Sequence, residues 1–288
     1  MGAMAYVFPR VDVAGVSLSR MIVGTNWLAG WSHRSPAADK MIKATYPTAE
    51  PLVEVLSAYM ENGVDTIMGL FSQTPAIHKA IRLTEEKFNR PMIIIDTPII
   101  NVDDNKEGRK EAEDRIKLSK ELGATFCLPH HSSVEKLVDK GAGVINRIGD
   151  YTTMIRENGM IPGLSAHMPE LIVYSDNNSY DVETYIQIYN CLGFLMQVEV
   201  EAVAAIIHGA KKPVMTIKSM AAGRVTPYIG LNFSWATLRK CDMITVGSFR
   251  ADEVYENIEI SRAAFEGRYP ELERRASPNA KQAALGGK

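Results

Sequence analysis

The sequence predicts an α/β protein that folds as one (β/α)8 TIM barrel. Eight short apolar runs, rich in β-branched residues, recur along its 288 residues. Each run is followed by a longer stretch with apolar residues at three- and four-residue spacing, the pattern of an amphipathic helix. Eight such pairs within about 260 residues fit a closed barrel of parallel strands better than an open sheet.

The expected strands are continuous apolar runs, as in parallel sheets covered on both faces. They are Met21–Gly24, Thr66–Met68, Met92–Ile95, Thr125–Leu128, Ile161–Leu164, Tyr185–Ile188, Val214–Ile217 and Met243–Val246. The expected helical segments are Ala49–Asn62, Ile77–Phe88, Lys106–Leu122, Val134–Asn158, Pro169–Tyr174, Val198–Gly209, Leu231–Arg239 and Ala251–Glu266. No repeat, linker or change of composition divides the chain, so we expect one domain over residues 1–276 and a flexible tail over 277–288.

Composition narrows the class of protein. The 32 basic and 34 acidic side chains give a net charge of −2, which disfavours an electrostatically driven nucleic-acid binder. The chain contains no apolar run of about 18 residues that would span a membrane. Met1–Pro9 lacks the pattern of a signal peptide, and three widely spaced cysteines suit reduced thiols. We expect a cytoplasmic protein whose partner is a small-molecule substrate.

In a barrel of this class, the chemistry sits at the carboxyl ends of the strands and in the loops that follow them. Polar residues stand at these positions after most of the expected strands. They are Asn26, Asp96, His130, His131, Ser165, His167, Lys218, Ser219 and Ser248. Three of the six histidines fall on this one rim. As neighbours in a strand, His130 and His131 are expected to point in opposite directions unless the chain bends after Pro129.

Several rim segments resemble the aldo-keto reductase family. "GLSAHMPEL" (Gly163–Leu171) is similar to the family's fifth strand, whose serine helps to hold the nicotinamide carboxamide. "IKSMAAGRVTP" (Ile217–Pro227) resembles the loop that passes over the cofactor pyrophosphate, and "VGSFRADEVYEN" (Val246–Asn257) resembles the unit that contacts the adenosine end of NADP. The resemblance implies NADP contacts at Ser165, Ser219, Gly223, Ser248, Arg250, Glu256 and Asn257. It also places His130 of "CLPHH" (127–131) at the family's active-site histidine.

The catalytic set of that family is mostly missing. Aldo-keto reductases use Asp, Tyr, Lys and His; here Met68 stands at the Asp position and Pro98 at the Lys position. No tyrosine occurs between Tyr59 and Tyr151, so the proton donor after the second strand is absent. The loss of general-acid help is worth roughly 10²–10⁴-fold in rate. We therefore expect the fold to persist without the carbonyl reduction.

The replacement residues suggest a metal-assisted reaction. Asp96, His130, His131 and His167 follow three successive strands and could converge on one divalent Zn, Mn, Fe or Co ion. The leading hypothesis is a metal-assisted lyase, isomerase or hydrolase for a small, oxygen-rich, sugar-like metabolite. In it His130, Lys218 and Asp96 are catalytic, and Asn26 and Trp27 orient the substrate. The plainer alternative is that each rim histidine is a hydrogen-bonded lining residue and that Asp96 caps a turn.

Other interpretations stay open. An NADP-dependent oxidoreductase or redox isomerase would use His130 as a weak acid, and a non-catalytic cofactor or ligand sensor would need only the phosphate-contacting loops. Lys218 could form an imine or, more simply, bind a substrate oxyanion or a cofactor phosphate. The loop Ala29–Pro47 is expected to be a lid or a subunit contact. The apolar segment Asn190–Val200 is expected to cover the substrate or to form the contact of a homo-oligomer, unless it packs on the barrel's own helices.

Overall fold

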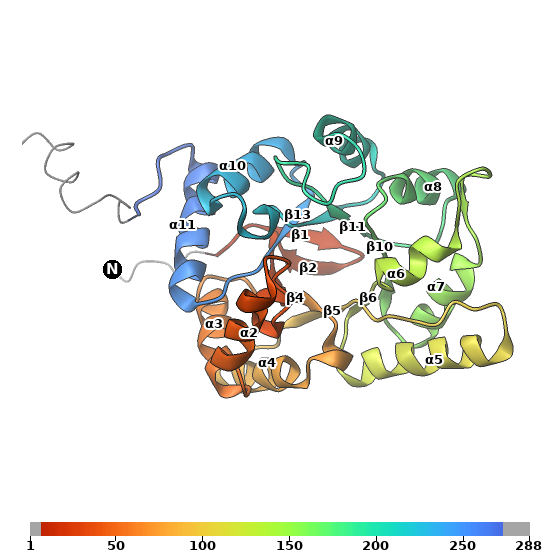
Figure 1. Cartoon of the computed structure of the whole chain (residues 1–288), viewed down its shortest axis with the longest axis horizontal. Coiled ribbons are helices and arrows are strands. Elements are labelled where there is room, and N and C mark those ends of the chain that lie inside the picture. The colour runs from red at the N-terminus through yellow and green to blue at the C-terminus, as the bar shows by residue number, and fades with distance from the viewer. Residues whose placement is uncertain (1–6, 273–288) are drawn as a thin grey trace, which may run out of the picture.

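A computed structural model describes residues 7–272 of the chain. Its centre is a ring of parallel strands, which confirms the predicted barrel (Figure 1). The strands are β3 (Met21–Gly24), β4 (Thr66–Gly69), β5 (Ile93–Asp96), β6 (Phe126–Cys127), β9 (Ile161–Pro162), β10 (Leu164–Ala166), β11 (Tyr185–Ile188), β12 (Val214–Ile217) and β13 (Met243–Val246). β9 and β10 are two parts of the fifth strand position: β6 pairs with β9, β10 pairs with β11, and the ring closes there.

Residue 163, between β9 and β10, is a glycine for a steric reason. A Cβ at this residue would lie 2.7 Å from both the Leu128 side chain and the Thr184 carbonyl oxygen. Only glycine permits this close approach of neighbouring strands.

Helices surround the ring and separate its strands from solvent (Figure 1). They are α3 (Glu50–Glu61), α4 (Pro75–Phe88), α5 (Lys106–Glu121), α7 (Ile148–Glu157), α8 (Glu170–Asn178), α9 (Val200–Gly209), α10 (Pro227–Thr237) and α11 (Ala251–Glu266). Seven of these broadly match the expected helical segments. The expected tail, residues 277–288, lies outside the described residues.

The single helical segment expected over 134–158 is wrong. Its first half contains a 3-10 turn (Glu135–Leu137) and a hairpin of β7 (Val138–Asp139) and β8 (Val144–Ile145), and only the second half forms α7. The side chain of Asp139 accepts a hydrogen bond from Ala142 N–H, and Gly143 adopts a left-handed φ of 66°. This turn chemistry ends helical periodicity before α7 begins.

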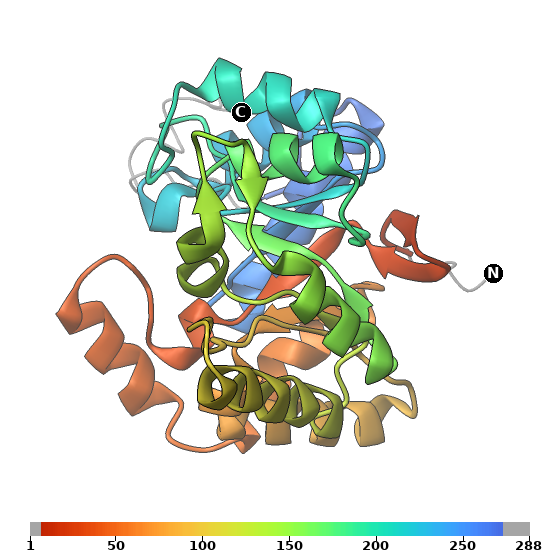
Figure 2. The same ribbon diagram turned by 90° about the vertical axis from the view of Figure 1, so that its right-hand side faces the viewer.

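A second hairpin closes the amino-terminal end of the barrel and was not expected. It consists of β1 (Arg10–Val13) and β2 (Val16–Ser19), joined by Ala14 and Gly15, both at positive φ. Val13 and Leu18 pack in one cluster with the barrel interior, together with Ile22, Phe126 and Met215 among others. Figure 2 shows this hairpin and the segment that follows β3 at opposite sides of the molecule. The barrel is therefore plugged at one end, and its polar cavity lies at the other.

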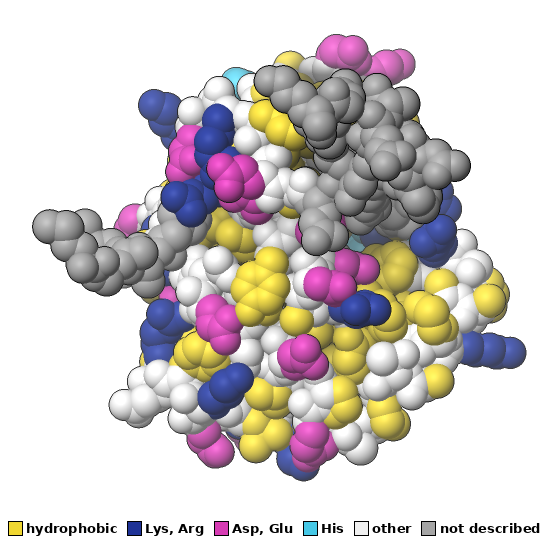
Figure 3. Space-filling view, turned by 90° about the vertical axis from the view of Figure 1, so that its left-hand side faces the viewer, with side chains coloured by type: hydrophobic (Ala, Val, Ile, Leu, Met, Phe, Trp, Pro, Cys, Tyr) yellow, Lys and Arg dark blue, Asp and Glu magenta, His cyan; other side chains and the backbone are white. Residues whose placement is uncertain are grey.

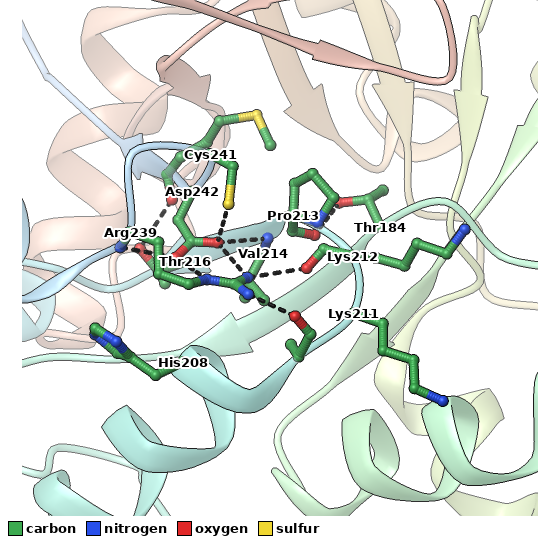
Figure 4. A network of polar contacts seen from close by, with 12 residues as sticks. Thr184, His208, Lys211, Lys212, Pro213, Val214, Thr216, Arg239, Cys241 and Asp242 are labelled. Atoms are coloured by element: carbon green, nitrogen blue, oxygen red, sulfur yellow. Dashed lines mark hydrogen bonds and ion pairs between the residues drawn. The ribbon is translucent and has the colours of Figure 1, made fainter.

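A polar network ties the start of β12 to the start of β13 (Figure 4). The fully buried carboxylate of Asp242 accepts hydrogen bonds from Val214 N–H at 2.9 Å and from Arg239 Nη2 at 2.7 Å. Arg239 also donates to the carbonyl oxygens of Ala210 and Lys212. These contacts satisfy a buried charge and lie far along the strands from the carboxyl-end rim.

The outer surface near α3 and α11 mixes charges of both signs. Figure 3 shows basic and acidic side chains interspersed with apolar ones on this face. Arg262 pairs with Glu266 within α11 at 2.9 Å, and Arg268, just beyond the end of this helix, pairs with Glu259 at 2.6 Å. No helix within residues 7–272 combines the length and the apolar character that crossing a membrane requires.

Candidate functional site

A cavity of about 390 Å³ opens at the carboxyl ends of the strands; we call it the rim cavity. It is lined by Gly24, Thr25, Asn26, Trp27, Trp31, Ser32, His33, Met68, Gly69, Leu70, Gln73, Thr97, His130, His131, Ser165, His167, Ile186, Ile217, Lys218, Ser219, Met220, Ala222, Gly223, Thr245 and Gly247. This set contains one lysine and four histidines, and none of these described lining residues is Asp or Glu. Such a lining favours an anionic ligand over a cationic one.

Three histidines form a contiguous group on one side of the rim cavity. The rings of His131 and His167 stack, with centroids 3.6 Å apart and planes 17° apart. The His130 ring lies 4.2 Å from that of His131. His130 and His131 face the same cavity because the chain turns after Pro129 and the short helix α6 (His131–Val134) begins at His131. The two side chains were expected to point apart only if the strand continued through them, and the strand ends before His130.

The hydrogen bonds of His130 define its chemical form. Its Nδ1 accepts the backbone N–H of Ser132 at 3.3 Å and lies 2.8 Å from Ser132 Oγ. A ring whose Nδ1 accepts carries its proton on Nε2 when neutral. Burial, and next the charge of His131, lower the pKa of His130 to about 4. His130 is therefore a neutral imidazole at neutral pH, with Nε2–H as its donor.

Glu135 connects the loops after the fourth and fifth strand positions. Its Oε1 accepts the backbone N–H groups of His167 at 2.5 Å and Met168 at 3.0 Å. Its Oε2 lies 3.6 Å from His131 Nδ1. Burial alone would raise the pKa of Glu135, but the His131 ring and the two backbone donors together hold that pKa below its usual value. Burial, with the charges of His131 and Lys218, lowers the pKa of His167 to about 4.

Lys218 stands at the end of β12 with its side chain on the rim cavity. Its Nζ makes no hydrogen bond or ion pair with any residue between 7 and 272, and burial lowers its pKa to about 8. The adjacent Ser219 is 1% exposed, and its Oγ also lacks a hydrogen-bond partner within the described chain. The Lys218 ammonium thus lines a cavity without an acidic side chain, an arrangement that a bound oxyanion would satisfy.

Comparison with known proteins finds similar folds at low sequence identity. No family model matches the chain, and no curated protein matches it. Among solved structures, a Pseudomonas aeruginosa protein provisionally classed as an aldo-keto reductase aligns at TM-score 0.66 and 13% identity, covering 92% of this chain and 100% of that one. The aldo/keto reductase of Klebsiella pneumoniae in complex with NADP and acetate aligns at TM-score 0.55 and 12% identity, covering 97% and 95%. Aldose reductase of Giardia lamblia aligns at TM-score 0.53 and 10% identity, covering 98% and 92%.

The barrel is aldo-keto reductase-like. At 10–13% sequence identity, the structural similarity establishes the fold only. The chemistry has to be inferred from the residues on the rim. Met68 occupies the cavity wall where the resemblance expects an Asp, while Pro98 does not line the cavity. Of the four catalytic positions that the resemblance implies, the cavity lining thus keeps the histidine, His130, and lacks the Asp and the Tyr, and the Pro98 at the Lys position lies outside it.

The aldo-keto reductase-like barrel does not bring Asp96 into the cavity. Ile95 belongs to the barrel interior, so the next residue on the strand faces outward. The fully buried Asp96 accepts Ser119 Oγ–H at 2.6 Å and Phe71 N–H at 3.1 Å, and Thr97 lines the cavity instead. Within the described residues no group of three or more His, Cys, Asp and Glu is arranged to hold a metal ion. The predicted ligand set of Asp96 with His130, His131 and His167 is therefore not assembled.

The predicted NADP contacts divide into two groups. Ser165, Ser219 and Gly223 line the rim cavity, as the resemblance implies for the nicotinamide and pyrophosphate. The residues predicted to contact the adenosine end, namely Ser248, Arg250, Glu256 and Asn257, do not line it. The buried Ser248 Oγ contacts the Tyr59 hydroxyl at 2.8 Å and accepts a hydrogen bond from Asn257 Nδ2 at 3.0 Å. The guanidinium of Arg250 pairs with Asp252 at 2.9 Å.

Trp27 lies between the two loops that the resemblance assigns to the cofactor. A Cβ on Gly247 would be 3.2 Å from Trp27 Cδ1, and a Cβ on Gly223 would be 3.7 Å from Trp27 Cζ2. The indole therefore spans the gap between the loop after β12 and the loop after β13. Trp27 thus contacts both of the loops that the resemblance assigns to NADP. Asn26 and Trp27 both line the cavity, the position predicted for substrate contacts.

The segment after β3 was expected to be a loop and contains two helices. α1 (Asn26–Ala29) is short, and α2 (Pro36–Thr45) begins after Ser35, whose side chain accepts the Ala38 N–H. A serine N-cap followed by proline at the first helical position is a sequence signal for this start. Beyond α2, the Tyr46 hydroxyl donates to the Phe249 carbonyl oxygen, and the two rings meet edge to face.

Arg224 joins three loops at the mouth of the cavity. Its guanidinium lies 4.0 Å from the centre of the Phe194 ring and 3.4 Å from the His33 carbonyl oxygen. His33 and Gln73 also line the cavity, and neither was named as a candidate from the sequence. Both residues lie in segments that follow the carboxyl end of a strand, and this position alone could have predicted that they line the cavity.

Proposed function

We propose that this protein is an enzyme, a lyase or isomerase that acts on a small, oxygen-rich carbonyl compound bearing a negative charge. The observation that supports it is the rim cavity itself. Lys218 lines it without an ion-pair partner among the described residues, four histidines share the lining, and the lining contains no carboxylate. Its volume of about 390 Å³ suits a small metabolite.

Carbonyl lyases and isomerases share one difficult step. Breaking a C–H or C–C bond next to a carbonyl group places negative charge on the carbonyl oxygen in the transition state. A preorganised positive charge that meets this oxygen away from water is usually the largest single contribution to such catalysis. Lys218 supplies that charge at the wall of the cavity.

The same step requires a group that moves a proton. His130 and His167 are neutral at neutral pH, because the pKa of each is lowered to about 4. The Nε2–H of His130 can donate to a developing oxyanion, and the neutral imidazole of His167 can accept a proton from carbon. The indoles of Trp27 and Trp31 give apolar walls against which a sugar-like or planar substrate can pack.

The proposed reaction differs from the metal-assisted hypothesis in that it needs no metal ion. The metal-assisted hypothesis rested on Asp96 joining the histidines, and the Asp96 carboxylate instead accepts hydrogen bonds from Ser119 and Phe71 behind the strand. Lys218 takes over the role of stabilising negative charge that the ion was expected to fill.

Ligand binding provides the first test. Of the three tryptophans, Trp27 and Trp31 line the cavity, while Trp235 packs against Phe8 and Phe265. We expect small carbonyl acids to change the indole fluorescence saturably, also in Trp235→Phe, and neutral analogues to bind at least tenfold more weakly. Lys218→Ala should abolish that preference, whereas Lys240→Ala, at an exposed lysine outside the cavity, should not. Equal affinity for neutral and anionic analogues would overturn the proposal.

Proton exchange tests the catalytic part. Incubation of bound carbonyl acids in D2O should replace hydrogen by deuterium at the carbon next to the carbonyl group, as followed by proton NMR. We expect His130→Ala and Lys218→Ala to slow this exchange by at least 10²-fold, in the range of lost acid–base catalysis. Saturable binding without exchange or bond cleavage for any ligand would instead identify a non-catalytic ligand sensor.

An NADP-dependent oxidoreductase is the second candidate function. It is favoured by the likeness to the Klebsiella reductase in complex with NADP and by Ser165, Ser219 and Gly223 on the cavity wall. In that mode the Trp27 indole, which packs beside Gly223 and Gly247, would compete with the cofactor for the space between the two loops. This candidate therefore predicts that Trp27→Ala tightens NADP binding and that Arg250→Ala weakens it. Tight NADP binding by the wild type, with turnover that requires the nicotinamide, would establish it over the lyase or isomerase.

A further inference from the structure

We propose that Lys218 is a covalent catalyst, whose Nζ forms an imine with the carbonyl carbon of the substrate. The inference rests on the proposed function, since it assigns the manner in which the same cavity activates a carbonyl compound. It names an aldehyde or ketone that also carries an anionic group as the substrate class. Three features of the structure support it.

The first feature is the isolation of Lys218. The surface lysines Lys79, Lys140 and Lys212 pair with the carboxylates of Glu50, Glu170 and Glu183 at 2.8 to 3.4 Å. Lys218 has no comparable partner in the described part of the chain, although it lines a cavity. An amine that is not held by a carboxylate keeps its lone pair available once it loses a proton.

The second feature is the burial of this amine. Burial lowers the pKa of Lys218 to about 8, so about a tenth of the molecules carry a neutral, nucleophilic amine at neutral pH. An ordinary solvent-exposed lysine is neutral in fewer than about one in a thousand molecules under the same conditions. Lowered basicity in an apolar pocket is the usual means by which proteins activate lysine toward carbonyl groups.

The third feature is the backbone conformation that holds Lys218 in place. Lys218 has a φ of 66°, in the left-handed region that long side chains rarely adopt, and its carbonyl oxygen accepts the Ala221 N–H at 2.7 Å. Ala221, Ala222 and Gly223 also have positive φ. Backbone strain of this kind persists only where the surrounding structure holds the residue in place, and such residues cluster at active sites and ligand-binding segments. Here it breaks the alternation of β12 directly after Ile217, and Lys218 lines the cavity.

The chemistry balances without a further reactant. The neutral Nζ attacks the carbonyl carbon, a C–N bond forms, and the proton released from nitrogen reaches the carbonyl oxygen. A second proton, relayed from solvent, allows the hydroxyl group of this carbinolamine to leave as water, which gives a protonated C=N bond. That cation accepts the electron pair of a neighbouring C–H or C–C bond as it breaks. Reprotonation at carbon and addition of water then release the product and restore the amine.

Groups that relay these protons line the same cavity. The charge of Lys218 is among the causes that lower the pKa of His33, His130 and His167, which places all three within electrostatic reach of it. The water that forms can leave through the cavity, which opens to solvent.

Reductive trapping tests the inference. The protein is incubated with glyoxylate, pyruvate and a small aldehyde acid in the presence of sodium cyanoborohydride, then measured by intact mass spectrometry and peptide mapping. We expect one reduced adduct per chain, located on Lys218, with a rate of formation that rises with pH and has its midpoint near pH 8. Lys218→Arg should lose the adduct by at least 50-fold relative to wild type and still bind the anions by indole fluorescence. Lys240→Arg should react like wild type.

The outcomes separate the inference from the function on which it rests. Adducts spread over several lysines, or an adduct that persists in Lys218→Arg, would overturn the assignment of Lys218. Saturable binding and deuterium exchange in wild type without any trapped adduct would overturn the imine and leave the proposed function standing, with Lys218 as an oxyanion partner. If no carbonyl acid binds to the protein or exchanges deuterium, both the imine and the proposed function are wrong.

Discussion

Glu135 holds His167 by its backbone: Glu135 Oε1 accepts the His167 N–H at 2.5 Å and the Met168 N–H at 3.0 Å. This one carboxylate joins the end of the fifth strand position to the turn that follows α6. It also lies 3.6 Å from the ring of His131, which stacks on His167. Glu135 is therefore a positioning residue, because it sets the relative placement of two cavity histidines without lining the cavity itself.

Removal of the Glu135 carboxylate should destabilise the fold and shift the histidines. Hydrogen bonds to a charged group are worth about 1.5–3 kcal/mol, so we expect Glu135→Ala to lower the free energy of unfolding by about 2–4 kcal/mol. Glu135→Gln keeps one acceptor oxygen and should lose less. Because the Glu135 charge raises the pKa of His130 and His167, its neutralisation should move both pKa values still lower. Urea unfolding and histidine NMR titration measure the two effects.

The control for this prediction is Lys136→Ala, at the exposed neighbouring residue, which should change stability by less than about 0.5 kcal/mol. If the His167 resonances of Glu135→Gln titrate as in the wild type, Glu135 does not set the electrostatics of that ring.

Lys218 should reduce stability at neutral pH. Burial lowers its pKa from 10.5 to about 8, so the folded protein holds the protonated form at a cost whenever the pH is below that value. We expect Lys218→Met to raise the free energy of unfolding by about 1–3 kcal/mol at neutral pH. The cost is fully present below about pH 8 and disappears as the pH approaches 10.5, where the amine is neutral in both states. The gain of Lys218→Met should therefore shrink across this interval.

Chemical unfolding of both proteins at neutral pH and near pH 10 makes this comparison. A gain that does not depend on pH would mean that better packing of methionine, rather than removal of the buried ammonium, stabilises the variant.

The barrel and the position of its rim were predictable for a physical reason. Strands buried on both faces need continuous apolar runs, and seven of the eight runs match strands of the structure to within two residues. Lys218, His130 and His167 were found from their place after these runs, because parallel strands in a barrel end on one face.

Orientation was harder to predict than position. Asp96 follows an inward-facing Ile95, and a change of one residue in register decides between the cavity and the outer helices. The bend after Pro129 brings His131 to the side of His130, whereas side chains of neighbouring residues in a strand point to opposite faces. The insertion of the Trp27 indole between Gly223 and Gly247 depends on packing between distant segments, which no local pattern encodes.

The network at the opposite end of the barrel should be a major source of stability. Asp242 is fully buried and accepts the backbone N–H of Val214 as well as three donors of Arg239. Removing one partner of a buried ion pair leaves the other uncompensated. We expect Asp242→Asn to lower the free energy of unfolding by about 3 kcal/mol, measured by urea unfolding, without any change in ligand affinity at the rim cavity. Lys240→Ala, in the same turn and exposed, is the matched control. A loss below 1 kcal/mol would show that the neutral amide supports the network equally well.

Arg224 should hold together the three loops at the mouth of the cavity. Its guanidinium packs over Phe194 at 4.0 Å and donates to the His33 carbonyl oxygen at 3.4 Å, so one side chain connects the loops after β3, β11 and β12. A cation–π contact at a partly exposed place is worth about 0.5–1 kcal/mol, and its loss together with the long hydrogen bonds should cost about 1–1.5 kcal/mol.

We therefore expect Arg224→Ala to raise the rate of backbone hydrogen exchange by about tenfold in residues 31–34 and 192–196, and to speed ligand release, with the barrel strands unchanged. Mass-detected hydrogen exchange measures the first effect and stopped-flow indole fluorescence the second. Arg109→Ala, at an exposed arginine on α5 that pairs with Asp150, should affect neither set of loops. If the two segments exchange at wild-type rates in Arg224→Ala, the loops are held by their own packing, such as the hydrogen bonds of Asn190 to the backbone of Phe194. Faster exchange confined to residues 31–34 and 192–196 would show that the Arg224 contacts restrain these loops and control the entry of substrate.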